Sequence, residues 1–132
     1  MEETSKPLPP DLPLSRGYWQ AAREGRLVVQ RCTGCGTLRH YPRLLCTACH
    51  DSGVDWVELS RRGAIHSWTV SHHAFHPAFR DELPYALVTV DLEEGVRALG
   101  RWNGGELQIG QPVIGHFETD GERAELWFSR CK

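Results

Sequence analysis

Four of the five cysteines in this 132-residue chain stand in two close pairs within one short stretch, RCTGCGTLRHYPRLLCTACH. Each pair follows the pattern C-x2-C, with ten residues between the pairs, and the four residues are Cys32, Cys35, Cys46 and Cys49. Thiolates two residues apart on a tight turn can bind one metal ion from two sides, and two such turns complete a tetrahedral site of four sulfurs. The spacing therefore predicts a metal site, with zinc as the expected ion and iron as the alternative.

The residue after each cysteine pair bears on how well each turn, or knuckle, holds the ion. Gly36 follows the first pair, and a residue without Cβ allows a positive φ, so that backbone N–H groups can point at sulfur. His50 stands at the equivalent place in the second knuckle and is less suited to it. Because the protein fills all four coordination positions, the ion is expected to be structural and to do no Lewis-acid chemistry.

Two other uses of paired cysteines fit less well. Nothing in the sequence is typical of a secreted, disulfide-bonded protein, and the two pairs lack the βαβ setting of a redox C-x-x-C motif. Cys131, next to the last residue, is expected to be a free thiol.

The elements that must position the cysteines can be read from the flanking sequence. A short helix is predicted over 16–24, with Ser15 as its cap and Gly25 at its end. Tyr18, Trp19 and Ala22 form one apolar stripe on it. We interpret that stripe either as a face that docks on a partner or as a surface that packs on the cysteine-containing segment of this chain, here called the ribbon. The sequence leaves both interpretations open. Strands are predicted over 26–32, 38–42 and 54–60.

The second half of the chain changes to a β pattern. Five strands are predicted in about 70 residues, over 63–74, 85–93, 95–102, 112–119 and 123–130. Five short strands favour a small Greek-key barrel of the OB type, with an open sandwich as the alternative. Gly100 and Gly115, inside strands, suit the sharp bends of such a barrel. The fold class is thus mainly β, with an arm over 1–14, a helix and zinc ribbon over 15–60, and a barrel over 61–132.

Other residues that could bind a metal ion or a ligand form weaker patterns. His72, His73 and His76 stand close together, but neighbours on a strand point to opposite faces, so exposed histidines are favoured over a second metal site. Four arginines could form a patch for the phosphates of a nucleotide-bearing ligand, or could be solubilising charge, and both interpretations stay open. They are Arg39, Arg43, Arg61 and Arg62.

Charge and hydropathy narrow the classes of function. Residues 63–132 hold six Lys/Arg against ten Asp/Glu, which argues against binding a phosphate backbone there. No apolar run is long enough to span a bilayer, and the polar, proline-rich start lacks the layout of a secretory signal. We therefore expect a flexible arm at the start of a cytoplasmic protein.

The ordered set of segments resembles a family of small bacterial and archaeal proteins that join a rubredoxin-like zinc ribbon to an OB-fold. The matching segments, from about residue 13 onward, are GYWQAAREGRLVVQRCTGCG, HYPRLLCTAC, DWVELSRRGAIHSWTVSHH and LPYALVTVDLEEGVRALGRW. Two departures are His50, where the family usually has glycine, and a single proline before Arg43.

The resemblance implies a non-catalytic companion of thiolase-superfamily enzymes, of the acyltransferase or aldolase type, and of hot-dog-fold acyl-CoA hydratases. Such a companion, known also from steroid side-chain degradation, stabilises its partner and helps to form an acyl-CoA site. The four arginines above would then contact acyl-CoA. The family also contains fusions, so the chain could be an excised domain of a larger hydratase.

The sequence leaves three hypotheses for function. The first is the accessory role, with the partner interface expected at Trp19, His72, Phe75 and Phe79. The alternative is a single-stranded nucleic-acid binder that stacks bases on Trp68, Tyr85 and Trp102, which the acidic second half opposes. A third is an electron carrier with iron in the ribbon.

Overall fold

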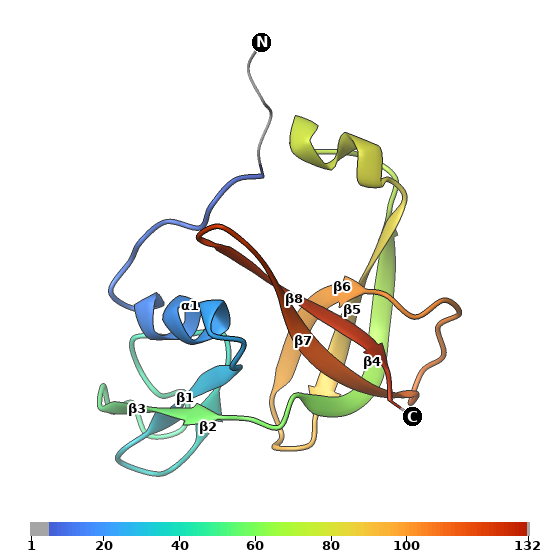
Figure 1. Ribbon diagram of the computed structural model, residues 1–132. Coiled ribbons are helices and arrows are strands. Elements are labelled where there is room, and N and C mark those ends of the chain that lie inside the picture. Colours follow the sequence, from blue (N-terminus) through green and yellow to red (C-terminus); the bar gives the residue numbers. More distant parts are fainter. Residues whose placement is uncertain (1–5, 132) are drawn as a thin grey trace.

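The computed structural model describes residues 6–131, and the first five residues of the predicted arm lie outside this part. Figure 1 shows a short helix beside a small sheet, followed by a barrel. The elements are α1 (Arg16–Arg23), β1 (Val28–Cys32), β2 (Leu38–Arg39), β3 (Val54–Glu58), β4 (Arg62–Ser71), the 3-10 helix η1 (Pro77–Glu82), β5 (Tyr85–Leu92), β6 (Arg97–Trp102), β7 (Pro112–Asp120) and β8 (Arg123–Arg130).

The first sheet has three antiparallel strands in the order β2-β1-β3. Strand β1 lies in the centre and ends at Cys32, so that the sheet leads directly into the first knuckle. The loop between β2 and β3 carries the second cysteine pair. The sheet therefore serves mainly to bring the two knuckles to one place.

Helix α1 packs on the chain's own core. Tyr18 and Ala22 of the predicted stripe are buried, and so is Ala21, which confirms the packing interpretation for Tyr18 and Ala22. Gly25 ends the helix region with a φ of 81°, which favours glycine. Ser15 stands at the expected N-cap position, but its side chain makes no capping hydrogen bond with the described residues.

The five later strands close into a barrel in the order β4-β5-β6-β8-β7, with β7 paired to β4. All pairs are antiparallel except β6 with β8. The predicted five-stranded barrel is thus confirmed over the open sandwich. The regular alternation expected for the first barrel strand breaks at a bulge between Ile65 and Ser67, and β4 ends at Ser71.

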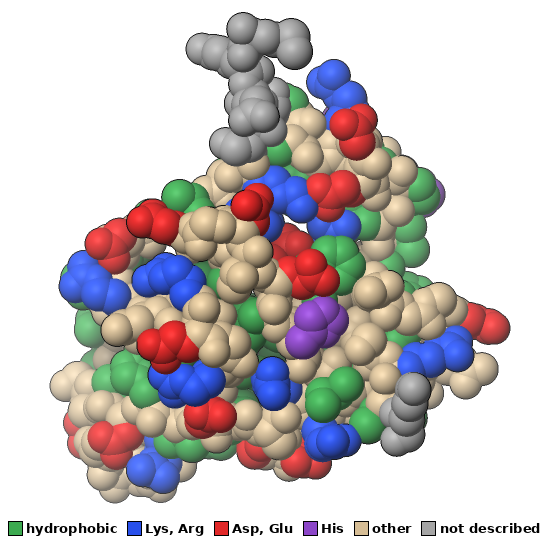
Figure 2. Space-filling view, in the orientation of Figure 1, with side chains coloured by type: hydrophobic (Ala, Val, Ile, Leu, Met, Phe, Trp, Pro, Cys, Tyr) green, Lys and Arg blue, Asp and Glu red, His purple; other side chains and the backbone are tan. Residues whose placement is uncertain are grey.

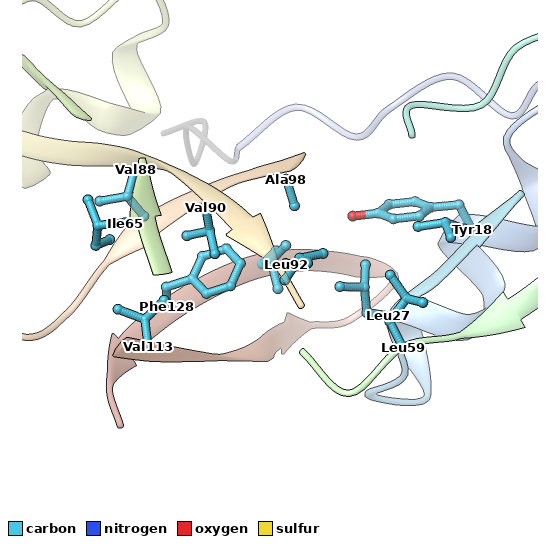
Figure 3. Packing of buried hydrophobic residues seen from close by; sticks show 12 residues of the cluster. Tyr18, Leu27, Leu59, Ile65, Val88, Val90, Leu92, Ala98, Val113 and Phe128 are labelled. Carbon is cyan, nitrogen blue, oxygen red and sulfur yellow. The ribbon is translucent and has the colours of Figure 1, made fainter. Parts of the chain in front are cut away.

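One hydrophobic core joins the two parts of the chain. Figure 3 shows Tyr18, Leu27 and Leu59 at one end of the cluster and barrel residues such as Val88 and Phe128 at the other. The ribbon contributes only a few residues to this core, so little apolar burial holds its knuckles. A bound ion is the usual source of stability for such a segment.

The two glycines inside barrel strands serve packing. A Cβ built on Gly100 would lie 2.7 Å from Cδ2 of Phe128, and one on Gly115 would lie 3.0 Å from its Cε1. Neither glycine has a positive φ. Both glycines therefore make room for the buried Phe128 ring, a steric role that was not predicted.

Candidate functional site

The four paired cysteines come together as one cluster. Their sulfur atoms all lie within 4.8 Å of one another. Cys32 Sγ lies 3.4 Å from Cys49 Sγ, and Cys35 Sγ lies 3.6 Å from Cys46 Sγ. A tetrahedron with metal–sulfur bonds of about 2.3 Å has sulfur–sulfur edges of about 3.8 Å. The cluster therefore fits a metal ion held by four thiolates, as the spacing predicted.

The two knuckles repeat the same backbone contacts. In the first, the N–H of Gly34 points at Cys32 Sγ over 3.3 Å, and in the second, the N–H of Ala48 points at Cys46 Sγ over 3.4 Å. N–H groups aimed at sulfur stabilise the thiolate. Hydrogen bonds from the backbone N–H groups of Cys49 and Ala48 lower the pKa of Cys46 to about 6.

The turn that closes each knuckle is also repeated. Gly36 N donates to Cys32 O over 2.8 Å, and His50 N donates to Cys46 O over 2.9 Å. Gly36 has a φ of 79°, and His50 has a φ of 66°. The positive φ predicted for Gly36 is thus present, and His50 adopts the same conformation in spite of its Cβ.

One buried side-chain network ties the second knuckle to the sheet. Arg39, only 6% exposed, donates from Nε to Gln30 Oε1 over 2.7 Å. The same oxygen accepts from Arg43 N over 2.7 Å, and Arg39 Nη2 donates to Arg43 O over 3.2 Å. Arg39 and Gln30 therefore fix the segment that leads to Cys46. This use of Arg39 was not visible in the sequence.

The other three arginines of the predicted patch have different settings. Arg43 is exposed, and Arg62 is exposed with Nη1 3.0 Å from Cys131 Sγ. Arg61 is half-buried, and its Nη1 donates to Gly25 O over 3.3 Å. Since the Arg39 guanidinium is enclosed, the structure brings at most three of the four side chains to solvent.

The residues expected at a partner interface fall in two places. His72 and Phe75 are exposed in the segment after β4, and Phe75 is 90% exposed. Trp19 and Phe79 are half-buried and line a groove on the barrel.

Among the described residues the only cluster of three or more potential metal ligands is that of the cysteines, so His72, His73 and His76 form no second cluster of this kind.

The groove was not predicted, and it has a volume of about 640 Å³. Its aromatic lining comes from α1, the ribbon, η1 and β5, and consists of Tyr18, Trp19, Tyr41, Phe79 and Tyr85. Arg101, from β6, lies in its wall although it is only 7% exposed. A charged residue inside the apolar stretch ALGRW was the one sequence feature that could have pointed here.

Arg101 in the groove wall belongs to a chain of ion pairs that continues beside the groove. Arg101 Nη1 lies 2.9 Å from Glu82 Oε1 and 3.8 Å from Glu125 Oε1, and the guanidinium stacks 4.1 Å from the Tyr85 ring. Glu82 Oε2 lies 2.6 Å from Lys6 Nζ. Partial burial raises the pKa of Glu82, but its hydrogen bonds to Lys6 and Arg101 outweigh this effect and lower it overall. These charges satisfy one another, which leaves the groove mainly apolar.

Two of the three aromatic residues proposed for base stacking already make contacts within the chain. The guanidinium of Arg101 covers the Tyr85 ring, and Trp102 Nε1 donates to Gly105 O over 2.8 Å. Trp68 is 37% exposed. On the face that Figure 2 shows, acidic and basic side chains are interspersed, unlike the basic groove typical of nucleic-acid binders.

No helix among the described residues is long and apolar enough to cross a membrane.

Comparison with known proteins identifies the family. Residues 19–55 match the family described as the ChsH2 rubredoxin-like zinc ribbon domain, and residues 56–118 match the ChsH2 C-terminal OB-fold domain. A solved structure titled "Ltp2-ChsH2(DUF35) aldolase" contains a chain that is 36% identical, with a TM-score of 0.83. The match covers 92% of this chain and 98% of that one. The chain belongs to the ChsH2-type DUF35 family.

Curated relatives of this DUF35 chain are longer proteins. It is 40% identical over 119 residues to the "Probable enoyl-CoA hydratase alpha subunit" of Thermomonospora curvata. It is 34% identical over 99 residues to the "3-oxo-4,17-pregnadiene-20-carboxyl-CoA hydratase alpha subunit" of Mycobacterium tuberculosis. The matches cover 86% and 73% of this chain, but only 37% and 31% of those relatives. The DUF35 chain thus spans about a third of their length.

Proposed function

We propose that the chain is a non-catalytic accessory subunit or domain that binds a thiolase-superfamily aldolase or a hydratase and helps to form its acyl-CoA site. The observation that carries this proposal is the match, along nearly its full length, to the ChsH2(DUF35) chain of an aldolase. The hydratase subunits named above support the acyl-CoA context.

Zinc is the proposed ion of the ribbon. Four thiolates satisfy its tetrahedral preference and leave no position for substrate, so the ion would hold the knuckles together. Elemental analysis of purified protein tests the assignment, and one zinc per chain is expected. A red protein with bound iron would contradict it and favour the electron-carrier hypothesis.

The acyl-CoA contact is proposed at the exposed arginines. Arg43 and Arg62 are exposed to solvent. Arg61 instead donates to the backbone carbonyl of Gly25, and the buried Arg39 donates to the backbone carbonyl of Arg43. Arginine pairs well with phosphate because of its planar, bidentate donors. Arg62→Ser is expected to raise the KM of the assembled enzyme for acyl-CoA with little change in kcat.

The partner contact is proposed at His72 and Phe75. A large side chain that is 90% exposed is unfavourable in water and typical of a residue that anchors an interface. Trp19 and Phe79 would extend this contact over the groove.

Affinity purification tests the function as a whole. The tagged chain, expressed in its own host, is expected to co-purify with a thiolase-like aldolase or a hydratase subunit, identified by mass spectrometry. Phe75→Ser should weaken this complex at least tenfold, while Ile109→Ser, a matched control at a 74% exposed residue in another loop, should not. A chain that remains alone at micromolar concentrations, or that converts a thioester by itself, would refute the proposal.

A further inference from the structure

The segment that precedes α1 lies across the aromatic groove. Pro7, Leu8 and Pro9 line the same cavity as Trp19 and Tyr85. Figure 1 shows this part of the chain, in dark blue, running from near η1 toward α1. The segment Lys6–Pro10 has no regular secondary structure, and it connects to the helix through residues 11–15.

One ion pair involves the first residue of this segment, and a second, exposed pair involves the residue that follows the segment. At one end, Lys6 Nζ lies 2.6 Å from Glu82 Oε2 and 5.1 Å from the centre of the Phe79 ring. The Lys6 side chain is only 24% exposed, which is low for a lysine near a chain end. At the other end, Arg16 Nε lies 3.0 Å from Asp11 Oδ1.

The segment and the groove have the features of proline-rich peptide recognition. Extended segments rich in proline bind in grooves lined by aromatic rings, because they lose little conformational entropy on binding. An ion pair between a basic residue next to the prolines and a carboxylate beside the groove adds a charge-assisted contact to such binding. Here Lys6 with Glu82 supplies that charge pair, and the cation over Phe79 adds a second contact.

The segment does not fill the space around it. A second hollow of about 540 Å³ lies along Leu8–Leu12 and α1, and the groove itself keeps about 640 Å³. Leu8 and Leu12 remain 54% and 52% exposed. The segment therefore spans the groove as a strap, held by a few contacts.

We propose that the groove is a recognition site for a proline-rich segment that begins with a lysine, and that the chain's own residues 6–10 occupy it in cis. A strap held mainly by one ion pair and one cation–π contact can be released. Anything that binds the aromatic groove must displace it. The loop that contains η1 thereby serves as the receptor for Lys6. This inference is independent of the identity of the partner enzyme.

The order of the strap in the full-length chain tests the proposal. In the wild type, the Leu8 amide is expected to have an NMR order parameter near 0.8, whereas Lys6→Glu, which repels Glu82, should lower it below about 0.6. Phe79→Leu should lower it in the same direction, and Lys6→Arg should preserve it. Asp81→Asn, a charge change at an exposed residue of η1 next to Glu82, is the matched control and should leave it unchanged.

A peptide of residues 1–14 added in trans tests the recognition itself. It should shift the resonances of the Trp19 indole and the Tyr85 and Leu99 amides in the Lys6→Glu chain. The wild-type chain should bind it at least tenfold more weakly, because its tethered strap competes at a high effective concentration. A peptide that carries Lys6→Glu should bind more weakly to either chain.

Two outcomes would overturn the proposal. One is a Leu8 order parameter that is the same in the wild-type and Lys6→Glu chains, together with no shift on addition of the peptide. The other is order at Leu8 that appears only at concentrations where the chain dimerises, which would assign the groove to a second copy.

Discussion

Gly36 and His50 have the same left-handed backbone conformation at equivalent positions of the two knuckles, with φ values of 79° and 66°. Each donates its N–H to the carbonyl of the first cysteine of its own pair. The knuckle thus requires this conformation, which costs an L-residue roughly 1–2 kcal/mol and costs glycine almost nothing. The second knuckle therefore folds under a strain that the first avoids.

Exchanging these residue types should change stability in opposite directions. A Cβ on Gly36 would meet nothing within 4 Å among the described residues, so Gly36→Ala acts through φ alone and should destabilise by about 1 kcal/mol. His50→Gly should stabilise by about 0.5–1 kcal/mol, since the greater freedom of glycine in the unfolded chain offsets part of the gain. Chemical denaturation of the metal-loaded protein measures both. A loss of stability in His50→Gly would mean that its side chain contributes a contact that outweighs the strain.

Removal of the metal should unfold the ribbon first. Little apolar burial supports the knuckles, so Cys46→Ser, which removes a buried ligand, should abolish stoichiometric metal binding and lower the Tm. Because Leu27, Val29 and Leu59 belong to the common core, the barrel should also lose stability. Cys131→Ser is the control and should keep both the metal content and the Tm. Elemental analysis and thermal melts give the two readings, and an unchanged Tm in Cys46→Ser would refute a structural role for the ion.

The sequence allowed the fold to be predicted because its patterns are local. The C-x2-C pairs, Gly25 and the β-branched runs of residues 85–93 each determine nearby structure. The groove could not be predicted, because its lining residues, such as Trp19, Tyr41 and Tyr85, are far apart in the chain. The same holds for Arg39, since neither interpretation of the arginines, a phosphate-binding patch or solubilising charge, predicted its buried pairing with Gln30.

The pairing of Gly100 with Phe128 should be sensitive to one methyl group. A Cβ on Gly100 would lie 2.7 Å from the ring and 2.9 Å from Leu126 O, so Gly100→Ala should destabilise by about 2–3 kcal/mol. The double variant Gly100→Ala/Phe128→Leu should be less destabilised than the sum of the two single variants, because the smaller side chain relieves the clash. Denaturant unfolding measures the coupling. Additive effects would indicate that the strand backbone, and not the ring, resists the change.

Loss of the Glu82 charge should weaken the barrel and release the strap together. Glu82→Gln leaves the buried Arg101 with Glu125 at 3.8 Å as its remaining carboxylate, so a loss of about 2 kcal/mol is expected. Asp81→Asn, at an exposed neighbour, is the control and should change stability by less than about 0.5 kcal/mol. Equilibrium unfolding measures both, and equal effects would show that the charge pairs of Glu82 contribute nothing specific.

His40 should make stability fall at mildly acidic pH. Its ring packs 5.4 Å from the Tyr18 ring and 3.9 Å from the Tyr41 ring, and neither nitrogen has a hydrogen-bond partner among the described residues. Burial lowers the pKa of His40 to about 4, so the folded protein holds this imidazole neutral while the unfolded chain takes up a proton near pH 6.5.

The contribution of His40 is therefore complete above about pH 6.5 and is lost progressively as pH falls to about 4, for a total of about 3 kcal/mol. His40→Phe keeps an aromatic ring in place and removes the titration, so its unfolding free energy should vary less over this range. Metal content must be measured in parallel, since protonation of the thiolates also destabilises the fold at low pH. Equal pH slopes in wild type and His40→Phe, at equal metal content, would assign the acid sensitivity to the cysteines instead.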